Sequence, residues 1–477
     1  MLRIRIASRF VAVALALAVP VAAGAALDPT TVTFERTSQV SQGAAYQAAE
    51  PSIRVDAASP TQRIWIAAPT GIGANTRSLP ASVEAGDLFW YSDDHGYSWN
   101  FVTGPEGLGS PTMVGGGDSD IATGFGSEVY GTGLTAANIT LASSCAEGES
   151  GTFTFNPISV LSAPDDRQWI DTYEDHPAPF GAPSFVLTYG NFGAGEIFFN
   201  QIQSPGCATP VGGPDIDASA LDCQIGPDCY QWPGNVAVDE KYGDAYVTYN
   251  TQGDPENDDI IVTRIDGGAS RVSTQADVVR FVAASHRPDT FDSFTVAAVD
   301  RAGNVYVVWS ERHPATQTTD TMLAVSKDRG ATWTKPIKVN SSPRTTTFPW
   351  IVAGDAGKID IVYYGTSAKG QSPETVAASS KWKVWMAQSL NALDAKPSFK
   401  ESAATGYMHQ GSICTSGTGC AAGTRDLLDF FQVDVDSLGL ANIAYTDNLN
   451  GPPDGSDPHQ ELIYFVKQHG GKRLYGK

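Results

Sequence analysis

The stretch Ser326-Lys327-Asp328-Arg329-Gly330-Ala331-Thr332-Trp333 lies between two runs of strand-forming residues, 322–325 and 334–339. A second copy, Ser92-Asp93-Asp94-His95-Gly96-Tyr97-Ser98-Trp99, follows a similar run at 88–91. Both fit the pattern Ser-x-Asp-x-Gly-x-Ser/Thr-Trp, which predicts a hairpin turn. In such a turn the Asp carboxylate accepts backbone N–H groups, the Gly supplies a position with φ > 0, and the Trp buries its ring between neighbouring strands.

An internal repeat extends from these turns over most of the chain. Seven segments of eight residues align without gaps, at 49–56, 117–124, 166–173, 232–239, 293–300, 348–355 and 429–436. Five of the seven end in Asp, and four of these are followed closely by Gly, which is a hairpin signal. A β-branched and aromatic run follows each turn, as in V-Y-V-V-W at 305–309. The repeat predicts an all-β fold: a β-propeller of seven four-stranded antiparallel blades, with six blades as the alternative.

The two ends of the repeat predict how the ring closes. The last unit lacks a fourth strand and ends after residues 462–467, while the segment 31–40 alternates like a strand that belongs to no unit. Pairing these two segments would close the ring and remove an exposed sheet edge. Residues 26–477 are therefore expected to form a single propeller domain.

Residues 1–25 have the layout of a secretory signal. Arg3, Arg5 and Arg9 precede an apolar run at 10–21, and small residues follow at 23–25. The run is short for a membrane span, and cleavage is expected near residue 25. A membrane anchor is the less favoured alternative, because the small residues come directly after the apolar run. We expect a secreted protein, extracellular or periplasmic, without a membrane span.

Cysteine usage agrees with export. The close spacings favour Cys223–Cys229 and Cys414–Cys420 as loop disulfides, which leaves Cys145 and Cys207, although sequence alone does not fix the pairing. The full chain has a net charge of −21, and loss of residues 1–25 removes three of its 31 basic residues and none of its 52 acidic ones. A surface this acidic argues against nucleic acid and anionic membranes as partners.

Candidate site residues follow from the alignment of the seven segments. Their first four positions are expected at the mouth of the ring, the usual ligand face of a propeller. Polar and aromatic residues at or beside these positions are the candidate catalytic residues Asp118, Asp120, Arg167 and Arg425 and the candidate ligand-binding residues Glu50, Asp166, Trp169, Asp429 and Gln432. Asp118 and Asp120 are expected to face the same side, where they either raise each other's pKa and provide a proton donor or share a cation.

Such a rim suits a carbohydrate pocket or a hard cation such as Ca²⁺, and no cofactor is required. The alternative is that each of these side chains bonds to the neighbouring blade and has no ligand. Structural ion-pair networks produce the same pattern.

The two turn motifs resemble the Asp-box of the sialidase (BNR-repeat) superfamily, and the aligned segments resemble secreted bacterial members of it. In that family the Asp-box is a folding device far from the active site. The resemblance assigns a structural role to Ser92, Asp94, Gly96, Trp99, Ser326, Asp328, Gly330 and Trp333. It also implies arginines that hold a substrate carboxylate, an Asp acid/base and a Tyr nucleophile, for which Tyr364 is the best candidate.

The sequence departs from that family in its first unit. The segment P-S-I-R-V at 51–55 has Val55 after Arg54, where the family's Arg-Ile-Pro motif requires Ile-Pro. Two classes of function follow. One is an exo-acting glycoside hydrolase of the sialidase type, and the other is a non-catalytic propeller that binds glycan, protein or Ca²⁺ at its mouth.

Overall fold

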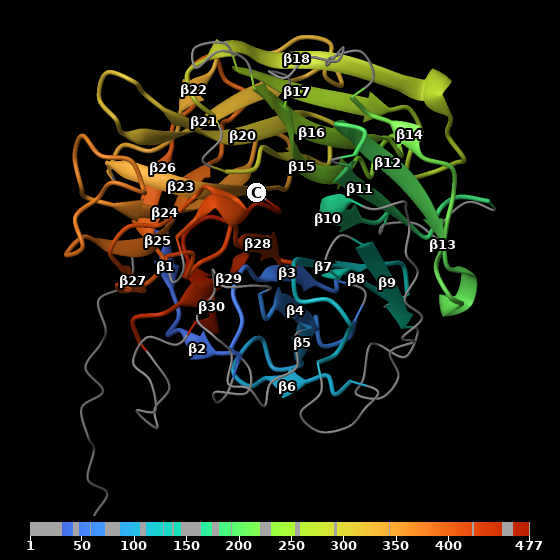
Figure 1. Cartoon of the computed structure of the whole chain (residues 1–477), viewed down its shortest axis with the longest axis horizontal. Coiled ribbons are helices and arrows are strands. Elements are labelled where there is room, and N and C mark those ends of the chain that lie inside the picture. Colours follow the sequence, from blue (N-terminus) through green and yellow to red (C-terminus); the bar gives the residue numbers. More distant parts are fainter. Residues whose placement is uncertain are drawn as a thin grey trace, which may run out of the picture.

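The ribbon in Figure 1 is a computed structural model of the chain, viewed down its shortest axis. The structure describes residues 31–41, 47–57, 59–71, 86–104, 111–126, 128–135, 138–144, 164–173, 181–191, 193–219, 230–252, 258–290, 293–342, 344–421, 424–450 and 461–476. Within these ranges the regular elements are β-strands joined by turns and loops, apart from the single-turn 3-10 helices η2 (Pro205–Cys207), η3 (Gln275–Asp277) and η4 (Gly417–Gly419). No helix among the described residues is long and apolar enough to cross a membrane.

The strands form seven antiparallel sheets, which are the blades of a propeller. Blade 1 contains β3 (Ser52–Val55), β4 (Ile64–Pro69), β5 (Asp87–Ser92) and β6 (Asn100–Phe101). Blade 2 contains β7 (Ser119–Thr123), β8 (Val129–Thr135) and β9 (Asn138–Ser144). Blade 3 contains β10 (Asp165–Asp171), β11 (Phe185–Asn191), β12 (Glu196–Gln203), β13 (Val211–Gly212) and β14 (Ile216–Asp217). Blade 4 contains β15 (Tyr230–Val238), β16 (Ala245–Gln252), β17 (Asp258–Ile265) and β18 (Val278–Arg287). Blade 5 contains β19 (Val296–Val299), β20 (Val305–Arg312), β21 (Thr319–Ser326) and β22 (Ile337–Lys338). Blade 6 contains β23 (Thr345–Ala353), β24 (Ile359–Thr366), β25 (Lys381–Ser389), β26 (Lys400–Ala403) and β27 (His409–Gln410). Blade 7 contains β28 (Gln432–Val435), β29 (Ala441–Asp447) and β30 (Leu462–Gly470), together with two strands from the start of the described chain.

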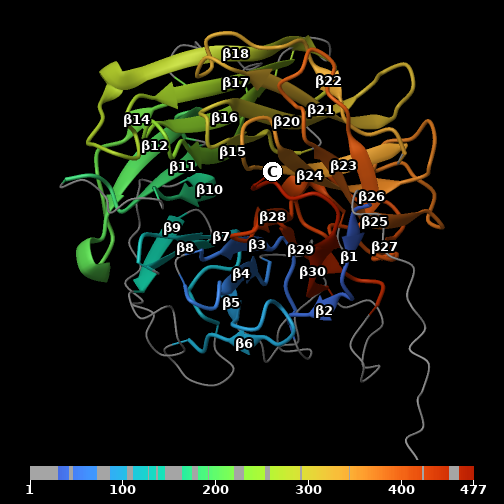
Figure 2. The same ribbon diagram turned by 180° about the vertical axis from the view of Figure 1, so that it is seen from behind.

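The first strand of each blade lines the central axis. These inner strands contact one another around the ring in the order β3, β7, β10, β15, β19, β23 and β28, and β28 returns to β3. Figures 1 and 2 show this closed ring from its two sides. The seven-bladed prediction is confirmed, although only three strands are described in blade 2, the unit that begins at 117.

Ring closure also follows the prediction. β1 (Thr33–Phe34) and β2 (Ser38–Gln39) pair antiparallel with β30, with Thr33 opposite Gly470 and Ser38 opposite Phe465. The earliest described strands therefore complete the last blade and cover the edge that β30 would otherwise expose.

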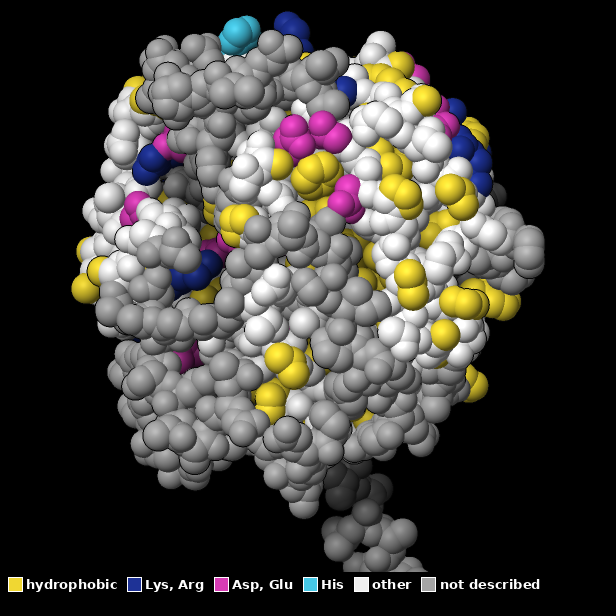
Figure 3. All heavy atoms as spheres, turned by 45° about the vertical axis from the view of Figure 1, so that its right-hand side comes forward, with side chains coloured by type: hydrophobic (Ala, Val, Ile, Leu, Met, Phe, Trp, Pro, Cys, Tyr) yellow, Lys and Arg dark blue, Asp and Glu magenta, His cyan; other side chains and the backbone are white. Residues whose placement is uncertain are grey.

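The apolar runs form the core because blades stack face to face. Both faces of a middle strand are then covered, so every residue of β20 except the last is buried. The core between blades 4 and 5 illustrates the packing, with Tyr246, Val307 and Trp309 each fully buried. On the side of the molecule in Figure 3, described hydrophobic side chains are spread among polar ones and form no single large patch.

The two turn motifs adopt the predicted conformation. Asp328 Oδ1 accepts hydrogen bonds from Thr332 N (2.8 Å) and Ser326 Oγ (2.9 Å), and Gly330 has a φ of 93°. Asp94 and Gly96 repeat this geometry in the first copy, with a 2.8 Å bond from Ser98 N and a φ of 90°. Because the hydrogen bonds from Thr332 favour the charged carboxylate, they lower the pKa of Asp328.

Disulfides agree with the expectation where the structure describes them. Cys414 and Cys420 form the predicted loop disulfide. Cys207 is also disulfide-bonded. Cys145, Cys223 and Cys229, like the proposed signal segment, lie outside the described residues.

Candidate functional site

Arg167 lies at the centre of the mouth because β10 contains a bulge. Asp166 pairs with Gly190 and Gln168 with Tyr189, so Arg167 is an extra residue without an opposite partner in β11. Its φ is 48°, in the left-handed region that residues with a Cβ rarely adopt. The bulge displaces Arg167 from the alternation of the strand, and its side chain contacts residues of four other blades.

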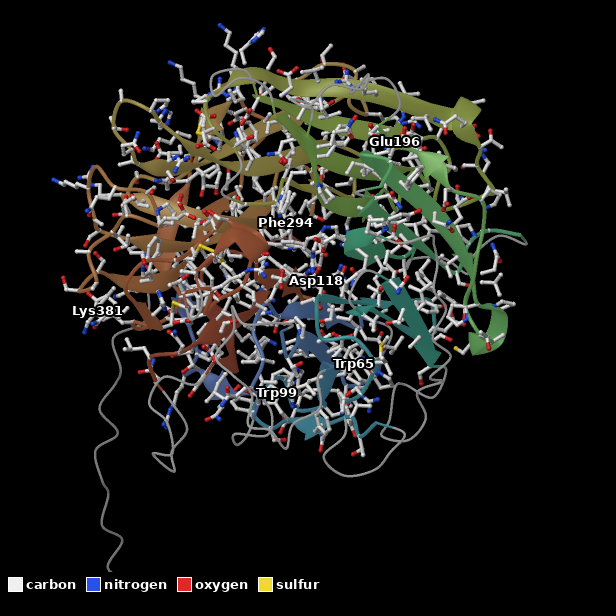
Figure 4. All side chains as sticks on the ribbon, in the orientation of Figure 1. Trp65, Trp99, Asp118, Glu196, Phe294 and Lys381 are labelled. Atoms are coloured by element: carbon white, nitrogen blue, oxygen red, sulfur yellow. A yellow bond between two sulfur atoms is a disulfide. The ribbon has the colours of Figure 1, made fainter. Side chains whose placement is uncertain are left out.

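Aromatic rings from three blades pack around the Arg167 guanidinium. Its central carbon lies 3.5 Å from the ring centre of Trp169, 4.2 Å from that of Phe430 and 5.5 Å from that of Phe294. Trp169 also packs on Trp350 at 5.0 Å. Figure 4 shows Phe294 and Asp118 near the middle of the ring, whereas Trp99 and Lys381 lie toward its outside.

Two carboxyl groups face Arg167 without bonding to it closely. The Glu50 Oε1 and Asp118 Oδ1 atoms lie 3.6 and 3.4 Å from Arg167 Nη1, which is beyond good charge-assisted hydrogen-bond distance. Arg167 is 3% exposed and Glu50 is fully buried. Among the described residues, no group hydrogen-bonds to the three guanidinium nitrogens or to the two Glu50 carboxyl oxygens. Buried polar groups of this kind normally have partners, so their hydrogen-bonding capacity is suited to a ligand.

Burial sets the protonation of this cluster. It raises the pKa of Glu50 well above its usual value, and the nearby Asp118 carboxylate raises it further. Burial, followed by the charge of Asp118 and a hydrogen bond with it, raises the pKa of Asp166 to about 8. Burial therefore favours the protonated form of both Glu50 and Asp166. Since Asp166 is partly exposed, its proton can reach a bound molecule.

A second arginine comes from the loop before β28. Arg425 Nε lies 3.2 Å from Asp429 Oδ1, and Arg425 Nη2 also bonds to the other carboxylate oxygen. Burial lowers the pKa of Arg425, but the Asp429 carboxylate outweighs this effect, so the pKa is raised overall. The disulfide Cys414–Cys420 lies in the same loop. Glu50 and Asp118 also act electrostatically on Arg425, which places it in the Arg167 cluster.

Asp120 and Gln432 lie away from Arg167 and connect blades. Asp120 Oδ2 accepts a 3.0 Å hydrogen bond from Ile170 N in the next blade. Gln432 Oε1 accepts one from Ile53 N at 3.0 Å, and its Nε2 lies 3.3 Å from Asp120 Oδ1. These bonds satisfy inner-strand N–H groups that have no sheet partner on the channel side. They account for both side chains without a ligand.

The expected pairing of Asp118 with Asp120 is wrong. Asp118 precedes the first residue of β7, so it does not follow the strand's alternation, and its carboxyl neighbour is Asp166. Asp120 uses its other oxygen to accept a bond from Ile121 N. The raised pKa therefore belongs to Asp166.

Tyr364 lies between blades 6 and 7. Its hydroxyl oxygen accepts a 3.2 Å hydrogen bond from Thr446 N, and its ring stacks on Phe431 at 4.1 Å. Burial raises its pKa, which disfavours the phenolate. None of its described contacts reaches Arg167, so its role as a nucleophile stays a prediction.

Residues that the sequence analysis missed complete the cluster. Phe294 and Phe430 occupy the second position of their aligned segments, level with Glu50, Asp118 and Arg167. That shared position is the signal that could have identified them. No group of three His, Cys, Asp or Glu side chains among the described residues is arranged to hold a metal ion.

Sequence comparisons find no match to this chain among family models or curated proteins. Comparisons of structure find similar folds at low identity. A Dyadobacter fermentans protein of unknown function is 13% identical over 92% of this chain and 99% of that one, with a TM-score of 0.45. A leech intramolecular trans-sialidase is 10% identical over 92% of this chain and 70% of that one, with a TM-score of 0.45. A polysaccharide lyase, an ulvan lyase, is 10% identical over 90% and 95%, with a TM-score of 0.46. We assign no residue role from these likenesses.

Proposed function

We propose that this protein is a secreted β-propeller glycoside hydrolase that acts on glycans at its mouth. One observation carries the proposal: the buried Arg167 guanidinium has unused N–H groups beside two carboxyl groups, Glu50 and Asp166, whose pKa values burial raises. A guanidinium binds sugar hydroxyl or carboxylate oxygens, and a carboxyl with a raised pKa can protonate a leaving oxygen. The disulfide in the Arg425 loop supports an oxidising compartment.

Asp166 is the proposed proton donor. Its proton passes to the glycosidic oxygen as the bond from that oxygen to the anomeric carbon breaks, and water supplies the hydroxyl group for that carbon. The proton that the water loses passes to solvent, because Asp118 is in hydrogen-bond contact with Asp166 and therefore lies on the same side of the anomeric carbon as the proton donor. Arg167 and Arg425 orient the sugar. We propose exo action, in which the end of the glycan is bound at Arg167 in the mouth.

A sialidase-type reaction would also need a tyrosine nucleophile, and the contacts of Tyr364 do not support that role. The same observation favours a second candidate, a mouth that binds glycan ends without cleaving them. The two candidates share Arg167 and differ in whether a product is released.

The test is Arg167→Ala, assayed on a panel of fluorogenic glycosides that includes a sialoside. We expect kcat/KM to fall about tenfold or more, which is the ~1.4 kcal/mol of one charge-assisted contact. Binding of the matching free sugars, measured by calorimetry, should weaken by a similar factor. For the non-catalytic candidate, only the binding loss would be seen.

Two further variants make this test interpretable. Arg167→Lys keeps a buried cation and should preserve the melting temperature while losing the planar fork of donors. Arg264→Ala removes an arginine on an outer strand and should leave activity and binding unchanged. Unchanged activity and binding of a folded Arg167→Ala protein would refute a ligand site at the mouth.

A further inference from the structure

A basic pocket of about 420 Å³ opens on the same face as Arg167, at the junction of blades 5 and 6. It is formed by the β20–β21 loop, the end of β22, the β22–β23 connection and the β24–β25 loop. Inner strands run from the mouth to the opposite face, so loops after second strands and connections between blades all lie on the mouth face. The polar side chains that line the pocket are Lys338, Arg344, Lys369, Thr316, Thr318 and Ser341.

Charge distinguishes this pocket from the rest of the molecule. Three cationic side chains line it and no carboxylate does, in a chain whose net charge is −21. Of these three cationic side chains, Lys338 is the one with a described salt bridge, in which its Nζ lies 2.7 Å from Asp320 Oδ1. Among the described residues neither Arg344 nor Lys369 has a carboxylate partner. Converging like charges repel one another, and an anion in the pocket removes that repulsion.

The backbone that carries these groups is fixed. Glu401 Oε2 accepts hydrogen bonds from Ser341 N (2.9 Å) and Ser342 N (2.8 Å), which holds the connection before β23. Arg344 N donates to Thr366 O at 2.7 Å, so the start of β23 is bound to the end of β24. Thr316 and Thr318 share a 2.8 Å hydroxyl contact at the pocket wall. The Arg344 side chain therefore projects from ordered backbone, so little backbone ordering is needed there to bind an anion.

We propose that this pocket is a subsite for an anionic substituent of an extended acidic glycan whose end occupies the mouth. This inference rests on the proposed glycan-binding function and names the class of glycan. The group recognised is an oxyanion, sulfate or carboxylate, because the Arg344 fork and two ammonium groups match such oxygens. One hydroxyl of the Thr316–Thr318 pair can add a hydrogen bond, whereas the Ser341 hydroxyl already donates to Glu401. An acidic protein would otherwise repel a polyanionic chain, and the pocket supplies the local attraction.

The experiment compares binding of three saccharides of equal length to the whole protein by calorimetry: one sulfated, one built of uronic acids, and one neutral. The test variant is Arg344→Gln/Lys369→Gln. The matched control is Lys335→Gln/Lys396→Gln, which removes two exposed cations on the opposite face. We expect the test variant to weaken binding of at least one acidic saccharide about tenfold or more and to reduce its salt dependence. The acidic saccharide that responds identifies the anion as sulfate or carboxylate, and the neutral saccharide and the control should show no change.

Either of two results overturns the subsite. The wild-type protein could bind acidic and neutral saccharides equally, or the control could lose as much affinity as the test variant, which would indicate general charge attraction. Failure of the mouth proposal is distinguishable, because Arg167→Ala weakens every saccharide whereas the pocket variant weakens acidic ones alone. A short monosaccharide glycoside that fills only the mouth should be unaffected by the pocket variant.

Discussion

Three unfavourable features coincide at Arg167. Its φ is positive, its charge is buried, and its N–H groups have no described hydrogen-bond acceptors. The backbone strain and an unpaired buried donor each cost about 1–3 kcal/mol of folding free energy, and a buried ion costs more. Stacking on Trp169 and Phe430 offsets part of this cost, since a desolvated cation–π contact contributes about 2 kcal/mol. A cluster that combines such costs with acidic neighbours is typical of a functional site.

The pKa of Asp166 predicts a pH dependence. If Asp166 donates the proton, activity should fall as the pH rises through about 8, where its proton is lost. Asp166→Asn should lower kcat on the order of 10²-fold and abolish this alkaline limb. The measurement is kcat against pH from 5 to 9, with Asp394→Asn on the opposite face as the control.

The raised pKa of Asp166 also determines how its contribution to the free energy of unfolding changes with pH. The pKa of Asp166 is raised on folding, so its contribution to the free energy of unfolding is complete below about pH 4 and is lost as the pH rises through about 8. An alkaline limb that survives in a folded Asp166→Asn protein would assign the proton transfer to another group.

At the residue scale, the sequence predicted which positions lie close together in the mouth, but it did not predict the direction of every side chain. The alignment correctly placed Arg167 level with Glu50 and Asp118. It could not show that β7 begins at Ser119, so that Asp118 lies just before the strand and Asp120 within it, because the direction of a side chain at a strand end depends on backbone angles. The bulge at Arg167 was not predicted either, because it also depends on backbone angles.

The turn between two strands is the best-predicted element, because its hydrogen bonds are local. The Ser, Asp, Gly and Ser/Thr of each motif bond to one another within seven residues, so the pattern alone determines the shape. The partner of the Trp was not predictable. Trp99 Nε1 lies 3.2 Å from Ser38 Oγ, and the Trp99 ring meets that of Phe465 at 5.3 Å, both from distant parts of the chain.

The turn therefore predicts a specific loss of stability. A Cβ on Gly96 would lie 2.2 Å from the Phe465 ring and would also need a φ of 90°. Gly96→Ala should lower the free energy of unfolding by about 2–4 kcal/mol, as the sum of backbone strain and overpacking. Gly126→Ala is the matched control, since its φ is 76° and nothing lies within 4 Å of its added Cβ. Equal losses in denaturant unfolding would mean that contact with blade 7 plays no part.

At the scale of the whole molecule, we expect that removing the two strands that close the ring destabilises all of it. A chain that begins at residue 47 lacks β1 and β2, so β30 becomes an exposed edge. Compared with a chain that begins at residue 31, we expect it to melt at a lower temperature and to self-associate. Calorimetry and size-exclusion chromatography measure both effects, and an unchanged monomeric melting transition would contradict the role of closure.

Closure also sets the order of events when the protein is made. Ile463 N donates to Ser41 Oγ across 422 residues, so the two sides of the last blade leave the ribosome at very different times. At about 5–20 residues per second, the early strand waits on the order of 20 to 85 seconds for its partner. During that interval its unpaired edge is open to other chains and to proteases. A chain that stops before β30 lacks the partner of β1 and β2 and cannot complete the ring.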